Sequence, residues 1–410
     1  MSVQHSHRDD FPALRRKIDG EGISYLDNAA TTLKPDSVIR AVTEYYETNG
    51  ANIHRGKHRL SEEASDSYEA SRVLIANHLG ASANEVVLTR NTTEALNLVA
   101  QGLDLDPDAY VVGCMDAHHS QMLPWRRAGR LALTRVDADG RLDREHFREL
   151  LRGRPKVVAL THCSNVTGVV HPVAELIAEI RSATDAVVVL DAAQSLPHQR
   201  INVRELDVDF LAFSMHKMLG PTGVGVLFGR SRLLAGLRPL AVGGGMVDWV
   251  DLDGSVDRRT PYVFEAGTPA IASVIGSGAA VRYLEALDPG ALHRHERDLA
   301  AALVGGALTS PGVRLVGPAE LTDRIGLVSL RLDGGVPTGD VARMLSDSYG
   351  YMVRSGHMCS QPLVTGLAGG EILRVSAYLY NEVAEITGFY EALNELLSCI
   401  GPAAPVGARR

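Results

Sequence analysis

The sequence predicts an α/β protein whose main sheet is mostly parallel. Short apolar segments rich in β-branched residues alternate with helical patterns through the middle of the chain. Such near-continuous apolar runs are typical of strands buried on both faces of a parallel sheet. The chain has 410 residues, which is more than a single core usually organises. We therefore expect a large α/β domain and a second, smaller domain.

Six strands are expected in the middle of the chain. In order, they are Glu85–Arg90, Tyr110–Gly113, Lys156–His162, Ala186–Asp191, Phe210–Phe213 and Gly225–Phe228. Helices are expected around them at Asp36–Thr48, Ser61–Leu79, Thr92–Gly102, Pro172–Ala183, Ala270–Glu285 and Leu292–Leu308. A threonine opens the helix at Thr92, and threonine is a preferred residue at helix starts. Strands that alternate with helices favour the α/β class.

The pattern changes from about Val313 onward. Strands are expected at Ile325–Leu332, Met352–Arg354 and Ile372–Ser376, and helices at Thr338–Tyr349 and Glu382–Cys399. This mixture predicts a compact α+β module. We expect residues 1–25 to pack with this module, residues 26–266 to form the large domain, and residues 267–410 to form connecting helices and the small domain.

Composition excludes several classes of protein. The formal charge is −8, so the basic surface of a nucleic-acid-binding protein is not expected. The four cysteines, at positions 114, 163, 359 and 399, form no CxxC motif, which predicts neither a metal site nor a disulfide scaffold. The first residues lack an apolar signal core, and the longest uncharged stretch contains too many polar residues to span a membrane. We expect a soluble, cytoplasmic protein without nucleic-acid or membrane partners.

Asp191 and Lys217 each follow an apolar strand, and open α/β sheets bind ligands at the carboxyl ends of their strands. This pair suits pyridoxal phosphate. A lysine forms a Schiff base with its aldehyde, while an acid keeps its ring nitrogen protonated. Ser214 and His216 would add donors for the phosphate. The alternative is coincidence, because an aspartate and a solvated lysine at strand ends also occur in unrelated α/β proteins.

Two further segments favour the cofactor. Thr92 and Thr93 lie between a strand and a helix, where backbone N–H groups and hydroxyls form an anion site. The same residues are equally natural as an ordinary helix cap. His118, followed by His119, comes after a strand and could place an imidazole on a cofactor ring. A histidine pair is also common on polar surfaces, and no third metal ligand lies at a useful spacing.

Landmarks of one family run through nearly the whole sequence. They are Tyr25–Ala30, Asn52–Gly56, Thr92–Glu94, His118–His119, Ser164–Asn165, Asp191–Gln194, Ser214–Lys217, Phe264–Pro269, Arg354–Cys359 and Arg374. Because these landmarks occur in the family's order and at its spacing, the sequence resembles the class V aminotransferase family of pyridoxal-phosphate enzymes. Within that family it is most similar to the cysteine desulfurases of the SUF iron–sulfur system. The resemblance implies fold type I, with a mixed, mostly parallel seven-stranded sheet, and a homodimer with sites at the subunit interface.

The resemblance also implies roles for individual residues. Lys217 would carry the cofactor, with Asp191 at the ring nitrogen, Gln194 at the ring oxygen and His118 stacked on the ring. The residues implied to hold the phosphate are Thr92, Thr93, Ser214 and His216, with Thr268 reaching across from a second subunit. Those implied to bind substrate are Arg374, at the carboxylate, and Asn165, His54, Arg55 and Arg354 around it.

Cys359 would decide the reaction. It falls at the family's persulfide cysteine, so the resemblance implies a thiolate that takes sulfur from L-cysteine and releases alanine. Arg354 and His357 are near enough in sequence to lower its pKa. Its surroundings, including Gln361 and Pro362, predict a loop. The alternative is an incidental thiol, since free cysteine is often a small buried hydrophobe. The other three cysteines lie in apolar or helical segments and are expected to be structural.

Three positions depart from the family pattern. Met358 replaces a histidine, Met215 replaces a glycine, and Asn91 stands where glycine is common. Because methionine fills irregular gaps, it could reshape the pocket. The sequence therefore leaves open a relative with other chemistry: a selenocysteine or cysteine-sulfoxide lyase, an epimerase or a transaminase. A non-enzymatic scaffold is a third alternative. For a desulfurase, we expect a sulfur-acceptor protein, such as the scaffold-type or small activator-type partners of the SUF system.

Overall fold

A computed structural model describes residues 7–18 and 20–400. The outer parts of the predicted end segments, residues 1–6 and 401–410, lie outside this range, as does residue 19. The main sheet has seven strands in the order β4-β10-β9-β8-β7-β5-β6. They are β4 (Val86–Thr89), β5 (Tyr110–Cys114), β6 (Arg130–Thr134), β7 (Val157–Thr161), β8 (Val187–Asp191), β9 (Phe210–Ser214) and β10 (Gly225–Gly229). The predicted α/β class and the mostly parallel seven-stranded sheet are confirmed.

The direction of the strands determines where a site can form. β10 is antiparallel to both of its neighbours, β4 and β9, while β9, β8, β7, β5 and β6 pair in parallel. The carboxyl ends of the parallel strands therefore meet at one edge of the sheet. Thr161, Asp191 and Ser214 are the last residues of β7, β8 and β9. Polar side chains from three strands are thus placed side by side at this edge.

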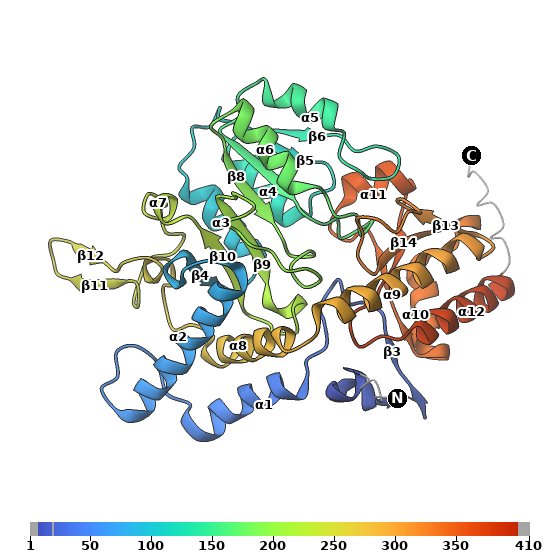
Figure 1. Cartoon of the computed structure of the whole chain (residues 1–410), viewed down its shortest axis with the longest axis horizontal. Helices are drawn as coiled ribbons and strands as arrows, with labels where there is room; N and C mark the ends of the chain where they lie inside the picture. The colour runs from blue at the N-terminus through green and yellow to red at the C-terminus, as the bar shows by residue number, and fades with distance from the viewer. Residues whose placement is uncertain (1–6, 19, 401–410) are drawn as a thin grey trace, which may run out of the picture.

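Helices cover both faces of this sheet (Figure 1). One face is packed by α3 (Thr92–Gly102) and α4 (His119–Ala128). The other is packed by α2 (Arg59–Leu79), α5 (Arg144–Leu151), α6 (Val173–Ala183) and α8 (Ile271–Glu285). Successive residues of a strand point to opposite faces, so Val157 and Ala159 join the first layer while Val158 and Leu160 join the second. Both layers are apolar, which explains the unbroken apolar runs in the sequence.

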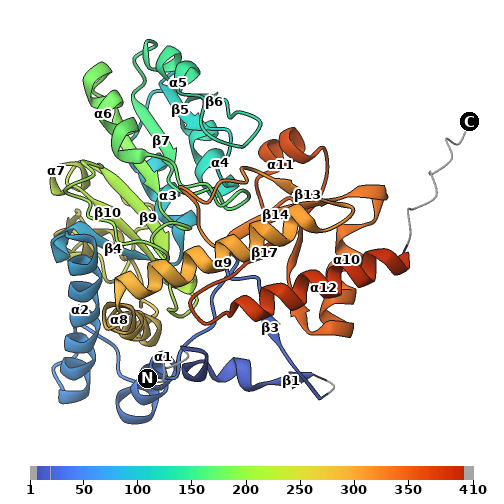
Figure 2. The same ribbon diagram turned by 45° about the vertical axis from the view of Figure 1, so that its right-hand side comes forward.

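A second, antiparallel sheet has four strands in the order β13-β14-β17-β16. They are β13 (Val313–Val316), β14 (Leu327–Leu332), β16 (Arg354–Gly356) and β17 (Ile372–Ser376). Its own core is shared with α9 (Pro289–Thr309), α10 (Thr338–Tyr349) and α12 (Val383–Ile400), the first and last of which lie side by side in Figure 2. β3 (Ser24–Tyr25) pairs with β15 (Tyr351–Met352), so the N-terminal segment joins this module. The boundaries at residues 25 and 266 stay predictions.

Several elements were not predicted. They are β1 (Lys17–Ile18), β2 (Glu21–Gly22), β6, β13, α4, α5, α7 (Ser231–Leu234), α11 (Gln361–Ala368) and the hairpin of β11 (Val247–Val250) and β12 (Ser255–Asp257). β6 is an edge strand that is only half-buried, so its sequence is less apolar. The loop expected at Gln361 and Pro362 is wrong, because both residues begin α11, where proline is tolerated in the first turn. α1 (Asp36–Glu44) is shorter than expected because it continues as a π-helical turn.

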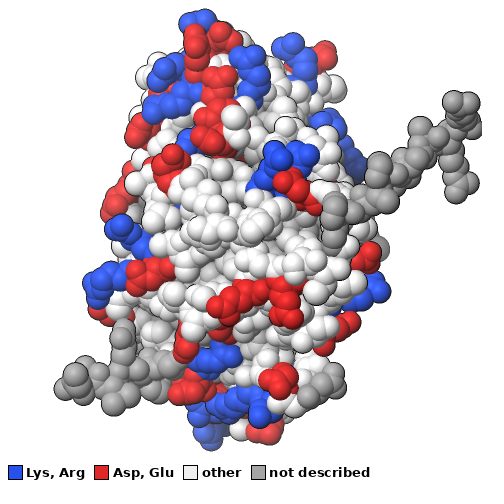
Figure 3. Space-filling model, turned by 90° about the vertical axis from the view of Figure 1, so that its right-hand side faces the viewer, with Lys and Arg blue, Asp and Glu red and all other residues white. Residues whose placement is uncertain are grey.

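Positive and negative side chains are mixed on one face of the molecule. On the face shown in Figure 3, Lys and Arg side chains lie interspersed with Asp and Glu side chains. Among residues 7–18 and 20–400, no helix combines the length and apolar character needed to cross a bilayer. The same residues hold no cluster of three or more His, Cys, Asp or Glu side chains placed for a metal ion.

Candidate active site

A cavity of about 330 Å³ opens at the edge where β7, β8 and β9 end. Twelve predicted site residues border it: Thr92, Thr93, His118, Asn165, Asp191, Gln194, Ser214, His216, Lys217, Arg354, Cys359 and Arg374. Asn91, which precedes Thr92 in the predicted anion-site segment, also borders the cavity, as do Ser120, Thr161 and Cys163, for which no site role was expected. Residues from both ends of the chain thus meet at the predicted edge of the sheet.

Lys217 and Asp191 form the reactive pair of this cavity. Lys217 ends a short turn that follows β9 directly. Burial lowers the pKa of Lys217 to about 8, although the Asp191 carboxylate opposes this shift. Burial also raises the pKa of Asp191, whose Oδ1 accepts a hydrogen bond from the Ala193 N–H at 3.0 Å. The pair therefore combines an amine that deprotonates easily with a buried carboxylate that would be stabilised by a cationic partner.

The lowered pKa of Lys217 leads to a prediction about stability. Without a cofactor, the unfolded chain binds a proton at Lys217 that the folded chain lacks between about pH 8 and the ordinary pKa of 10.5. The free energy of unfolding should therefore rise with pH in this window, relative to a Lys217→Met variant, by up to about 3 kcal/mol. Urea unfolding of both proteins near pH 8 and pH 10 measures this. An equal pH dependence in the two proteins would contradict it, and Lys156→Met, at an exposed lysine, is the control.

His118 is held as a neutral ring. It caps α4, and its Nδ1 accepts a hydrogen bond from the Ser120 N–H at 3.1 Å. Burial, followed by the positive charge of Lys217, lowers the pKa of His118 to about 4. Since Nδ1 is the acceptor, the proton of the neutral ring lies on Nε2. The neutral ring can therefore stack on a flat ligand while its Nε2–H stays available as a hydrogen-bond donor.

The start of α3 forms a cradle for an anion. The Thr92 N–H donates to Ser214 Oγ at 2.8 Å, and the hydroxyls of Thr92 and Ser214 lie 2.6 Å apart. Thr93 Oγ1 lies 2.7 Å from Ser120 Oγ, at the start of α4. Hydroxyls gathered around a helix N-terminus suit a phosphate group, because free N–H groups and the helix dipole both favour negative charge there.

A set of donors behind the cradle fixes the turn that carries Lys217. The carbonyl oxygen of His216 accepts from the Thr32 N–H at 3.0 Å, the Thr31 hydroxyl at 2.9 Å and Lys34 Nζ at 3.0 Å. Burial lowers the pKa of Lys34 to about 8. These contacts restrain the peptide that precedes Lys217, so its side chain enters the cavity from a fixed point. No role at the site was expected for these three residues.

Two arginines from the small sheet share one carboxylate. Arg354 and Arg374 are paired neighbours on β16 and β17. Asp27 accepts from Arg354 Nη2 at 2.8 Å and from Arg374 Nη2 at 3.1 Å. Arg374 is 3% exposed, and its Nε has no hydrogen-bond partner within the described structure. Arg374 borders the cavity, and a buried guanidinium at such a place suits a carboxylate ligand.

Asp27→Ala should destabilise the protein by about 3 kcal/mol, because a buried arginine would lose its only carboxylate partner among the described residues. Chemical denaturation measures this free energy of unfolding. Asp36→Ala is the matched control. It breaks an exposed pair with Arg15, worth less than about 1 kcal/mol. Equal losses in the two variants would show that Asp27 does not stabilise the buried charge.

Cys359 lies on the loop between β16 and α11, and its side chain is exposed. Its carbonyl accepts from the His119 N–H at 2.8 Å, which ties the loop to α4. The guanidinium of Arg354 bonds to Asp27 in this structure. Cys163 borders the same cavity, but its thiol is buried and its pKa lies well above the ordinary value because of that burial. Of these two thiols, Cys359 is therefore the accessible one.

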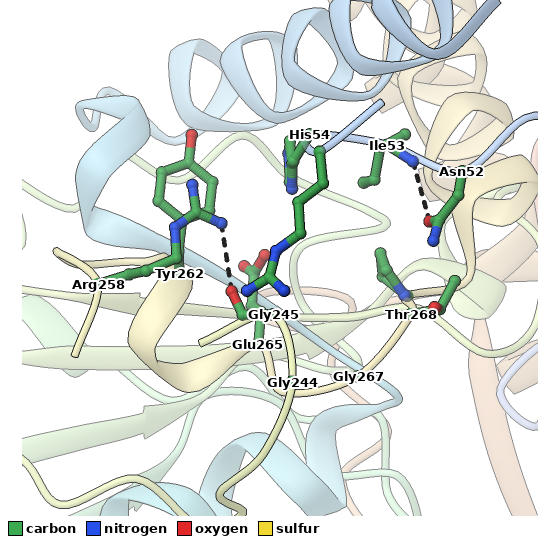
Figure 4. A pocket seen from close by; sticks show the side chains of 12 residues that line it. Asn52, Ile53, His54, Gly244, Gly245, Arg258, Tyr262, Glu265, Gly267 and Thr268 are labelled. Atoms are coloured by element: carbon green, nitrogen blue, oxygen red, sulfur yellow. Dashed lines mark hydrogen bonds between the residues drawn. The ribbon is translucent and has the colours of Figure 1, made fainter. Parts of the chain in front are cut away.

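His54, Arg55 and Thr268 do not border the Lys217 cavity of their own chain. They meet instead in a second cavity, near Gly245 and Tyr262, which Figure 4 shows. Within one chain, His54 and Arg55 therefore do not lie around the first cavity, and their contact with a substrate stays a prediction. The cause is local: His54 Nε2 bonds to Glu69 of α2 at 2.9 Å, which holds this segment against α2.

The fold and this constellation of residues are accompanied by clear similarity to known proteins. The model of the class V aminotransferase family matches residues 24–389, so the chain belongs to this family. The sequence is 42% identical to a probable cysteine desulfurase of Mycobacterium leprae, covering 92% of this chain and 93% of that protein. It is 41% identical to a probable cysteine desulfurase of Synechocystis, covering 96% of this chain and 95% of the relative.

Solved structures agree with the sequence matches. The cysteine desulfurase of Thermococcus onnurineus, in its apo form, superposes with a TM-score of 0.91 at 38% identity, covering 97% of this chain and 99% of that one. A cysteine desulfurase of Escherichia coli, in an S-sulfonic acid form, superposes with a TM-score of 0.86 at 34% identity, covering 96% and 98%.

Proposed function

We propose that this protein is a pyridoxal-phosphate-dependent L-cysteine desulfurase, which converts L-cysteine to L-alanine and leaves the sulfur as a persulfide on Cys359. The observation that carries this proposal is the meeting of an exposed thiol with Lys217, Asp191 and Arg374 at one cavity. The similarity to proteins named cysteine desulfurase over more than nine-tenths of the chain supports it.

The residues at the cavity fit pyridoxal phosphate. Asp191 is a buried carboxylate suited to a protonated ring nitrogen, and the start of α3 suits the phosphate. Gln194 donates to the Ala29 carbonyl at 2.8 Å, which fixes its amide at the border of the cavity, where it would contact the ring oxygen. Lys217 would carry the cofactor, and His118 would stack on it. When bound, the cofactor supplies an electron sink for the charge left by removal of the substrate's α-proton.

The protein's own groups would perform the remaining steps. Arg374, which borders the cavity, would bind the substrate carboxylate, and Lys217, once released as an amine, would move the α-proton. The Cys359 thiolate attacks the sulfur of L-cysteine, forming the S–S bond while the Cβ–S bond breaks. The electron pair of the broken bond stays with the substrate carbon, which gains a proton to become the methyl group of alanine. His118 borders the same cavity, where its neutral ring would lie on the cofactor and pass on a proton during turnover.

The second cavity suggests how two chains would work together. We propose that the protein is a homodimer in which Thr268, His54 and Arg55 of one chain complete the cofactor and substrate sites of the other. Their clustering outside the Lys217 cavity of their own chain supports this arrangement. We also propose a cytoplasmic location and transfer of the persulfide sulfur to an acceptor protein, for iron–sulfur cluster assembly or another sulfur-requiring synthesis.

Purified, cofactor-loaded protein should convert L-cysteine to alanine, and it should form one persulfide per site. Chromatography measures the alanine, and peptide mass spectrometry should locate the added sulfur atom on the peptide that contains Cys359. Cofactor-loaded protein that makes no alanine, even with a reductant and sulfur acceptors, would refute the proposal. Selenocysteine, cysteine sulfoxides and transamination substrates would then be screened for the alternative class V activities.

A further inference from the structure

The backbone around Cys359 is unusual. Met358 and Cys359 have φ angles of 53° and 55°, so two consecutive residues with side chains adopt the left-handed conformation. Such a conformation costs energy for any residue other than glycine, and it persists only when its surroundings impose it. Cys359 is exposed, whereas Met358 and Ser360 on either side are buried. The contacts of these two neighbours must therefore hold the loop in place.

The side chain of Asn165 contacts both neighbours of Cys359. Its Nδ2 donates to the Met358 carbonyl at 2.7 Å, and its Oδ1 accepts from the Ser360 hydroxyl at 3.1 Å. One amide group thus bridges the residues before and after the thiol. The Met358 side chain adds an apolar anchor, because it packs in a cluster with Val166 and Leu363.

The same asparagine is linked to the carboxylate-binding arginine. The backbone oxygen of Asn165 accepts a hydrogen bond from Arg374 Nη1 at 3.0 Å, and both residues are buried. Arg374, Asn165 and the loop therefore form one connected unit. Ser360 is 0% exposed and does not border the cavity, so it is the member of this unit that cannot touch substrate.

We propose that Asn165 and Ser360 form a clamp that positions the Cys359 thiol for sulfur transfer, with Ser360 as a positioning residue. This inference rests on the proposed desulfurase function and extends it. The resemblance assigns Asn165 to the substrate, whereas the contacts show its amide engaged with the thiol's own loop. If Ser360 acts through the loop alone, its loss slows formation of the S–S bond and leaves binding of L-cysteine unchanged.

The test compares full-length, cofactor-loaded wild type with Ser360→Ala. Ser277→Ala is the matched control, because Ser277 is also 0% exposed and its hydroxyl bonds within α8 to the Ser273 carbonyl at 2.8 Å. Rapid-quench mass spectrometry measures persulfide on Cys359 in a single turnover. The absorbance change on adding L-cysteine gives the half-saturating concentration, and hydrogen exchange reports on the amides of residues 357–361.

Ser360→Ala should form persulfide about tenfold more slowly, which corresponds to the loss of one hydrogen bond to a buried amide. Its half-saturating concentration should equal that of wild type, its loop amides should exchange faster, and Ser277→Ala should match wild type throughout. A wild-type rate of persulfide formation in Ser360→Ala overturns the proposal, and so does a defect in binding alone. If wild type makes no persulfide, the proposed function fails, and unchanged loop exchange in Ser360→Ala then overturns the clamp separately.

Discussion

Cys359→Ala should abolish persulfide formation and lower the rate of alanine formation from L-cysteine by at least about a hundredfold, because the nucleophile that accepts the sulfur is lost. Cys359 is the exposed one of the two thiols at the cavity, and the buried Cys163 has a pKa well above the ordinary value. Cys163 therefore cannot replace it near neutral pH. Initial rates of alanine release, measured with saturating L-cysteine, give the size of the effect.

Cys399→Ala is the matched control for this variant, because Cys399 is also an exposed thiol but lies on α12, outside the cavity. Its alanine and persulfide yields should equal those of wild type. Full alanine formation by Cys359→Ala would mean that sulfur leaves the substrate without attack by this thiol. That result would favour a lyase among the class V relatives, in which Cys359 is dispensable.

Lys217→Ala should lower alanine formation by at least about a thousandfold, since one residue both carries the cofactor and moves the α-proton. Lys217 is the only lysine among the described residues that border the cavity. The nearest alternative, Lys34, is held at the Thr32 and His216 carbonyls. No second amine is therefore placed to take over, and alanine assays with the purified variants measure the loss.

Lys217→Arg should be as inactive as Lys217→Ala, because a guanidinium keeps the positive charge but is not a nucleophilic amine near neutral pH. Lys156→Ala, at an exposed lysine, should retain wild-type activity and serves as the surface control. Substantial activity in Lys217→Arg would show that only a charge is required at this position, which would contradict the assigned role.

Sequence patterns predicted the fold well where packing and local signals agree. The helices at Thr92–Gly102 and Thr338–Tyr349 have the predicted bounds. In the first, a buried apolar face marks the segment, but the expected threonine cap is wrong: the cap is Asn91, whose side chain accepts a hydrogen bond from the Glu94 N–H. β6 and α4 were not predicted because an edge strand is half-buried and because α4 contains Pro124, which argues against a helix.

The site was predictable where chemistry requires particular residue types, and unpredictable where it depends on distant contacts. Lys217 and Asp191 follow strands, so their positions could be inferred from the sheet alone. The ion pair of Asp27 could not be inferred in this way, because its partner Arg354 is 327 positions away in the sequence. The effect of Met215 was also open, and the structure places this side chain in the core, away from the cavity.

The order in which the site is assembled along the chain has a consequence for synthesis. Domains usually form from the N-terminal side as a chain emerges from the ribosome. The seven strands of the main sheet are complete by residue 229, and Lys217 and Asp191 lie among them. Cys359 and Arg374 follow all seven strands in the chain, so they leave the ribosome after the main sheet. A chain interrupted before the small sheet would therefore lack both the arginine proposed to bind the substrate and the thiol proposed to hold its sulfur, so the proposed sulfur chemistry would begin only after that sheet is made.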